Sequence, residues 1–92
     1  MALNFSWDRG KAEANLEKHG VSFEEASTAF GDPLSLTVHD PGHSDDETRF
    51  VLVGLSFTGT LLVVVHSERK EGIRIISARE ATRRERRDYE QG

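Results

Sequence analysis

The chain has 92 residues, contains no cysteine and carries a formal net charge of −4 at pH 7. This length predicts a single domain over residues 1–92 with a modest core, because such a small domain buries only about 60% of its unfolded surface. The absence of cysteine excludes disulfides and thiolate metal sites. The N-terminus does not resemble a signal peptide, and the longest apolar run, residues 61–65, is too short to span a bilayer. We therefore expect a cytoplasmic protein without a membrane partner.

The N-terminal segment is predicted to form a short strand over residues 4–7 and then a helix over residues 9–18. Asp8 is a candidate N-cap, and Gly20 is the residue at which this helix would end. Ala12, Leu16 and His19 recur at helical spacing. They predict one apolar stripe along this helix, with the histidine at its end.

A second helix is predicted to begin after Ser22 and to reach about residue 30. Ser22 and Glu25 have the spacing of a capping box. In this motif the Ser22 hydroxyl would accept from the backbone N–H of Glu25, and the Glu25 carboxylate from the backbone N–H of Ser22. Gly31, Asp32 and Pro33 would break this helix.

The second half of the chain is predicted to form strands and a final helix. Period-two or unbroken apolar patterns indicate strands over residues 34–38, 49–55, 61–66 and 73–77. The connections are short, which favours an antiparallel sheet, and the apolar run of residues 61–66 predicts a central strand. A helix over residues 79–89 would place Glu85 and Tyr89 towards the sheet, with Arg83 and Arg87 facing outward. The fold class expected is therefore α+β.

Positive charge gathers towards the C-terminal end. Residues 1–65 contain four basic and ten acidic side chains, whereas residues 66–92 contain eight basic and six acidic ones, so the net charge changes from −6 to +2. A local basic surface can attract phosphate on an acidic protein, because salt screens charges beyond about 8–10 Å. The alternative is a solvated helix whose charges pair with one another.

Three segments resemble the BrnT family of bacterial type II toxins. They are FSWDRGKAEANLEKHGVSFEEASTAFGDP at residues 5–33, ETRF at residues 47–50 and RIISAREATRRERRDYE at residues 74–90. The resemblance implies a RelE-like fold, with two N-terminal helices on one face of an antiparallel sheet and a C-terminal helix. It also implies a ribonuclease that cuts RNA and inhibits translation and growth. A cognate BrnA-like antitoxin with a DNA-binding domain would neutralise it, and DNA would be contacted only through that antitoxin.

RNA cleavage without a metal needs a base for the 2′-hydroxyl, positive charge for the phosphorane and an acid for the leaving 5′-oxygen. Arg49, Arg74 and Arg79 are the candidates for the positive charge, because a guanidinium binds two phosphate oxygens at once. The alternative is that these arginines form ordinary ion pairs with Glu47 or Glu80.

The remaining catalytic candidates are Lys18, His19, Glu47 and Tyr89. His19 is expected at a helix C-terminus, where the helix dipole favours a positive imidazole that suits a general acid. Lys18 would either stabilise that helix end or contact a phosphate, and Glu47 is a candidate base. Tyr89 would stack on a base or donate a proton. Packing with a hydrogen-bonded hydroxyl is the alternative for Tyr89, and a structural role is the alternative for His19.

The candidate RNA-binding residues on the last helix are Arg83, Arg86 and Arg87. His66 is expected to be structural. The polar stretch HDPGHSDDE at residues 39–47 contains possible metal ligands but matches no metal-ligand spacing, so we predict neither a metal nor a cofactor.

A non-catalytic binding module is the alternative function. It would use the same arginines to hold a partner protein or nucleic acid without chemistry. A substitution that stops cleavage but leaves binding would distinguish the enzyme from the module.

Overall fold

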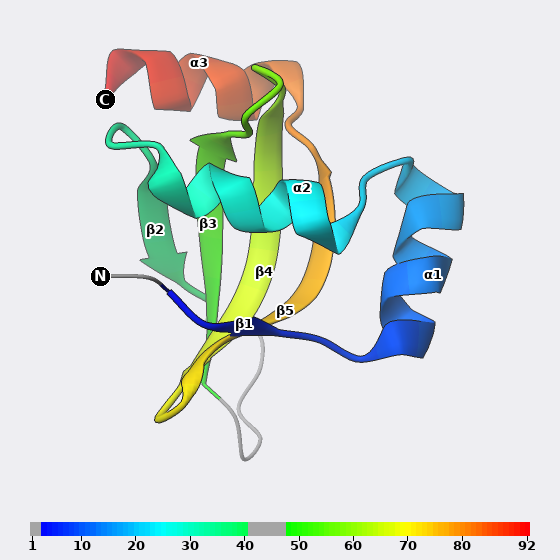
Figure 1. The fold of residues 1–92 in the computed structure, drawn as a ribbon. Coiled ribbons are helices and arrows are strands. Elements are labelled where there is room, and N and C mark those ends of the chain that lie inside the picture. The colour runs from blue at the N-terminus through cyan, green and yellow to red at the C-terminus, as the bar shows by residue number, and fades with distance from the viewer. Residues whose placement is uncertain (1–2, 41–47) are drawn as a thin grey trace.

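A computed structural model describes residues 3–40 and 48–92. The elements follow the order β1 (Phe5–Ser6), α1 (Arg9–His19), α2 (Phe23–Thr28), the 3₁₀ helix η1 (Ala29–Gly31), β2 (Leu36–His39), β3 (Arg49–Leu55), β4 (Leu61–Arg69), β5 (Gly72–Glu80) and α3 (Arg83–Gln91). Figure 1 shows α2 crossing the sheet, α1 beside the β5 edge and α3 across one end. Within the described residues, no helix is long and apolar enough to cross a membrane.

The sheet has five strands in the order β1-β5-β4-β3-β2. Strands β2 to β5 pair antiparallel as expected, but β1 pairs parallel with β5, so the prediction of a purely antiparallel sheet was wrong. The direction of β1 follows from where the chain goes next. It joins the sheet at Ile73 and Arg74 and then continues into α1, which lies beside the later part of β5.

Strand β4 is the centre of the fold. Leu62 and Val64 are fully buried, and Leu61 and Val63 are almost so. Since neighbouring residues of a strand point to opposite faces, this burial means that both faces of β4 are covered. On one face Leu62 and Val64 pack with Phe23 and other side chains of α2 and η1. The prediction of a central strand at this position is confirmed.

A buried asparagine attaches α1 to the sheet. The Asn15 side chain donates to the carbonyl of Ala78 at 2.8 Å and to that of Val21 at 3.0 Å, and accepts from the Ala78 amide at 3.1 Å. It therefore satisfies both backbone groups of Ala78 on the side of β5 that faces away from β4, beyond the two residues that pair with β1. The expected apolar stripe was wrong, because Leu16 and His19 are exposed and the buried residue of α1 is Asn15.

The last helix begins later than the sequence pattern suggested. Strand β5 continues through Arg79 to Glu80, and α3 begins after Thr82. Thr82 and Glu85 form a capping box, with the Glu85 carboxylate accepting from the Thr82 amide at 2.8 Å. The strand persists because Arg79 pairs with Val63 of β4. Arg83 and Arg87 are exposed, as predicted.

Tyr89 holds the far end of α3 against the rest of the protein. Its hydroxyl donates to Asp32 at 2.5 Å, and the same carboxylate accepts from the amides of Leu55 and Leu34, each at 2.9 Å. Loss of hydration alone would raise the pKa of Asp32, but these hydrogen bonds outweigh that effect and lower the pKa. The hydrogen bond to Asp32 also raises the pKa of Tyr89, so the phenol stays protonated.

Replacing Asn15 with alanine is expected to reduce the free energy of unfolding by about 2–4 kcal/mol. The substitution leaves the Ala78 amide and two carbonyls buried without partners. Chemical denaturation measures the change, and Glu17→Ala, on the exposed side of the same helix, is the control and should change stability by less than about 0.5 kcal/mol. Equal stability of the two variants would show that α1 is held by other contacts.

Candidate functional site

The strand register places three candidate arginines on one face of the sheet. Residues paired across strands share a face. Leu52, Val64 and Ala78 lie on the face covered by α1 and α2. The opposite face, called the open face below, carries three rows across β3, β4 and β5. They are Arg49–Ser67–Arg74, Val51–Val65–Ser77 and Val53–Val63–Arg79. Arg49, Arg74 and Arg79 therefore share one face, as required of groups that bind a single ligand.

Arg49 and Arg74 flank the buried Ser67. Two strand spacings of about 4.8 Å separate the backbones of the two arginines, so their side chains can reach one phosphate. Both residues are half-buried. Within residues 3–40 and 48–92, neither guanidinium has a carboxylate partner. Positive charge placed on a sheet without such a partner is suited to binding an anion.

Arg79 lies on the same face, about 13 Å along the strands from that row. It forms a bidentate ion pair with Glu85, with both N···O distances at 2.8 Å. The expected alternative partner was the carboxylate of Glu80, but Arg79 contacts only the backbone carbonyl of that residue, at 3.2 Å. The pair fixes the direction of the guanidinium, which has more N–H donors than these bonds use.

The ion pair also shifts both ionisation equilibria. The hydrogen bonds from Arg79, together with those from Thr82, lower the pKa of Glu85 to about 2, although partial burial acts in the other direction. The hydrogen bonds to Glu85 raise the pKa of Arg79. Glu85 is therefore ionised throughout the physiological range, and Arg79 remains a fixed cation.

Lys18 and His19 lie at the β5 edge rather than on the open face. Both are exposed in the last turn of α1. They line a groove between α1 and β5 whose strand side is formed by Ile76 and Ser77. Ser77 belongs to the middle row of the open face, so this groove borders it.

The other candidates are more widely spread. Tyr89 projects from α3 over β2 and β3 and is bonded to Asp32. This geometry matches the alternative of a packed tyrosine with a hydrogen-bonded hydroxyl. Arg83, Arg86 and Arg87 are exposed on α3. Glu47 lies outside the described residues, as do His43, Asp45 and Asp46 of the polar stretch.

His66 lies on the covered face and belongs to an aromatic cluster. Its ring contacts Phe30 edge-on, with 4.8 Å between the ring centroids, and stacks on Phe50 with 5.9 Å between the centroids. Burial lowers the pKa of this histidine, so the ring is neutral at pH 7. Among the described residues, no three His, Asp or Glu side chains gather to form a metal site.

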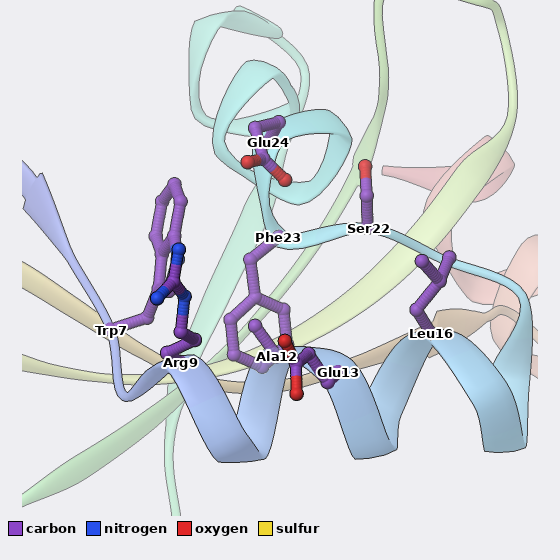
Figure 2. A pocket seen from close by; sticks show the side chains of 8 residues that line it. All are labelled: Trp7, Arg9, Ala12, Glu13, Leu16, Ser22, Phe23 and Glu24. Carbon is purple, nitrogen blue, oxygen red and sulfur yellow. The ribbon is translucent and has the colours of Figure 1, made fainter.

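A separate hollow lies on the other side of the molecule. It is a cavity of about 400 Å³ between α1 and the start of α2. Figure 2 shows Phe23 pointing from α2 towards α1, with Trp7 at one end and Leu16 at the other. The charged residues of its lining are Arg9, Glu13 and Glu24. Two carboxylates and one guanidinium do not suit a polyanion, which favours the open face as the phosphate-binding surface.

Sequence patterns did not reveal three residues that position the site. Asn15 fixes α1, Asp32 fixes Tyr89, and Glu85 fixes Arg79. Glu85 could have been identified from the Thr-x-x-Glu spacing that starts at Thr82, which is the signature of a capping box. Asn15 and Asp32 act on partners far away in the sequence, and no local pattern indicates such contacts.

The Arg79–Glu85 pair should make stability depend on pH between 4.5 and about 2. A carboxyl with a depressed pKa in the folded state contributes stability above its unfolded pKa and loses it as the pH falls through the folded value. Because the pair is partly exposed, we expect a contribution of only about 1–2 kcal/mol. Urea denaturation across this range tests it. Glu85→Gln keeps the capping box and should lose much of this dependence, whereas an unchanged pH profile would contradict the assignment.

The chain and its fold are similar to ribonuclease toxins. The family model for the ribonuclease toxin BrnT of type II toxin–antitoxin systems matches residues 7–85. The fold is similar to the 1.1 Å crystal structure of the Brucella abortus ribonuclease toxin BrnT, with a TM-score of 0.64 and 20% sequence identity. That match covers 89% of this chain and all of the Brucella chain. No curated protein matches the chain by sequence.

The family match spans most of the chain and contains Arg49, Arg74, Arg79 and their supporting residues Asn15 and Glu85. The α+β fold, with its five-stranded mixed sheet and three α-helices, is that of the Brucella toxin. The chain belongs to the BrnT family of ribonuclease toxins of type II toxin–antitoxin systems.

Proposed function

We propose that the protein is a metal-independent endoribonuclease that binds RNA on the open face. By cleaving this RNA it would inhibit translation and growth. Its place of action would be the cytoplasm, and a cognate antitoxin carrying a DNA-binding domain would neutralise it. One observation carries this proposal. Arg49 and Arg74 lie half-buried on either side of Ser67, without a carboxylate partner among the described residues, in a family of ribonuclease toxins.

The proposed reaction is attack of the ribose 2′-oxygen on the adjacent phosphorus. The bond from phosphorus to the 5′-oxygen breaks, giving a 2′,3′-cyclic phosphate and a 5′-hydroxyl. One proton leaves the 2′-hydroxyl and one is delivered to the 5′-oxygen, so the exchange is balanced without a metal or a cofactor. Extra negative charge develops on the phosphorane oxygens, and preoriented guanidinium groups stabilise such charge most when water is excluded.

Arg49, Arg74 and Arg79 are proposed to supply that positive charge. The open face is long enough for several phosphates, so the arginines would hold a stretch of RNA backbone rather than a single group. At the adjoining β5 edge, His19 remains the candidate general acid and Lys18 a candidate phosphate contact, and Glu47 remains the candidate base. Arg83, Arg86 and Arg87 would add a positive field that draws RNA towards this end of the protein.

Tyr89 is proposed to position α3 rather than to transfer a proton. Its hydroxyl proton is donated to Asp32, and this hydrogen bond favours the protonated phenol. Stacking of a base on the exposed part of the ring stays compatible with this contact.

A non-catalytic binding module would use the same arginines for an acidic segment of a partner. The two functions differ in one respect, because only an enzyme changes the covalent structure of the RNA. Cleavage products therefore decide between them.

Purified protein freed of antitoxin is expected to cut a synthetic RNA in EDTA and to leave 2′,3′-cyclic phosphate ends. Arg74→Gln should reduce kcat/KM by about 100-fold or more, the usual cost of losing one preoriented charge-stabilising group. Arg74→Lys should recover part of the loss, because lysine keeps the charge but not the fork. Gel electrophoresis of end-labelled RNA and mass spectrometry of the products provide the measurement.

Arg9→Gln is the matched control, since Arg9 is an exposed arginine beside the hollow on the other side of the molecule. It should cut at the wild-type rate. Equal activity of Arg74→Gln and Arg9→Gln would show that the site lies elsewhere. A folded wild-type protein that binds RNA but leaves it intact, with and without translating ribosomes, would favour the binding module.

Tyr89→Phe and Asp32→Asn together test the role of the tyrosine. If the hydroxyl only docks α3, Tyr89→Phe should lower the free energy of unfolding by about 1 kcal/mol and kcat/KM by less than about 10-fold. Asp32→Asn should cut RNA no faster than the wild type. A loss of about 100-fold or more in Tyr89→Phe, with full activity in Asp32→Asn, would instead identify the hydroxyl as the general acid.

A further inference from the structure

Charge is divided between two sides of α1. At 100° per residue, Lys11, Asn15 and Lys18 lie within an arc of about 60°, and His19 lies next to them. Glu13 and Glu17 fall on the opposite side of the helix. Because Asn15 is bonded to both backbone groups of Ala78, the basic side is the one held against β5. These contacts therefore fix the rotation of α1, so that its basic side faces β5 and its acidic side faces away.

This basic side forms one wall of a groove along the β5 edge. The groove is lined by Lys11, Ala14, Asn15, Lys18, His19, Ile76 and Ser77. No carboxylate is among these lining residues. The amide of Asn15 is already committed to backbone groups, which leaves the two lysines, the histidine and the Ser77 hydroxyl as the polar side chains of the lining.

A β-bulge shapes the strand side of the groove. The β4–β5 register shifts between Val65 and His66, so Val65 pairs with Ser77 and His66 pairs with Ile75. Ile76 is left without a pairing partner on β4. Bulges change the direction of a strand and occur often beside functional sites. Here the bulge lies at the level of Ser77, between the positions of Arg74 and Arg79 on the open face.

We propose that this groove is a second phosphate-binding subsite, in which Lys11 and Lys18 hold an RNA backbone phosphate next to those bound on the open face. The proposal rests on the proposed ribonuclease function and adds Lys11 to the residues that bind the substrate. Ser77 links the two surfaces, since it lines the groove and belongs to the middle row of the open face. The RNA would cross the β5 edge on its way from the arginines to α1.

Phosphate is favoured over a protein carboxylate by the chemistry around the groove. The adjoining face already carries three arginines, so a chain with regularly repeated negative charges can contact both surfaces. An ammonium group binds phosphate as a point charge and needs no defined orientation, which suits the exposed, flexible Lys11 and Lys18. An acidic segment of a partner protein is the competing ligand and is distinguished by the experiment below.

The test uses a 2′-O-methyl RNA decamer, which cannot be cleaved because its 2′-oxygen is blocked. Its affinity is measured by fluorescence anisotropy at several salt concentrations. Lys11→Ala should raise Kd about five-fold at low salt and should reduce the slope of log Kd against log salt by about 0.7, the value for one phosphate contact on a single strand. Lys11→Arg should retain most of the affinity. Circular dichroism and the denaturation midpoint confirm that each variant folds.

Lys70→Ala is the matched control. Lys70 is exposed beyond the end of β4, away from α1, and its replacement should leave both Kd and the salt slope at the wild-type values. Equal Kd values for Lys11→Ala and Lys70→Ala, with cleavage by the wild type intact, would overturn the subsite but not the ribonuclease. Loss of antitoxin binding without loss of RNA affinity in Lys11→Ala would overturn it in favour of a protein ligand. Failure of the wild type to bind or cut RNA would reject the proposed function itself.

Discussion

The whole arrangement depends on the need to cover β4 on both faces. Leu62 and Val64 point to one face and Leu61 and Val63 to the other, and all four are buried. Helices α1 and α2 cover the first face, and α3 covers only part of the second, beside β2 and β3. Among the described residues, α3 is the only helix that lies on this second face. Arg49, Arg74 and Arg79 lie on this second face, so the same constraint that builds the core also provides the proposed surface for a polyanion.

The supporting contacts act at a distance from the charges they position. Asn15 fixes α1 to the β5 edge, which orients the lysines of that helix. Glu85 begins α3 and holds Arg79, so one carboxylate serves both the helix and the proposed site. Asp32 ties the break after η1, the end of β3 and α3 together. Each of these three residues joins two elements, and none of them needs to touch RNA for its loss to disturb RNA binding.

The sequence predicted the elements that have a strong local pattern. The central strand, the Ser22 N-cap of α2 and the Gly20 end of α1 were all predictable from apolar runs and cap residues. The predicted capping box of α2 was only half right, because the Glu25 carboxylate accepts from the hydroxyls of Ser56 and Thr58 instead of the Ser22 amide. The parallel pairing of β1 was not, because a two-residue strand has no pattern of its own. The start of α3 was misplaced because Arg79 and Glu80 have good helix propensity, and their pairing with β4 overrides it. Arg49 and Arg74 were correctly predicted to lie on strands, whereas Arg79 was expected at the start of the last helix. The residues that support these arginines act through long-range contacts.

The central claim is that RNA phosphates bind to the open face beside α3 rather than in the hollow between α1 and α2. It is tested most directly by NMR titration of the arginine Nε–H and tryptophan indole signals with an uncleavable RNA. If RNA binds to the open face, the Nε–H signals of Arg49, Arg74 and Arg79 should shift, while those of Arg9 and the indole of Trp7 stay in place. Shifts confined to Arg9 and Trp7 would contradict it, because these two residues line the hollow on the opposite side.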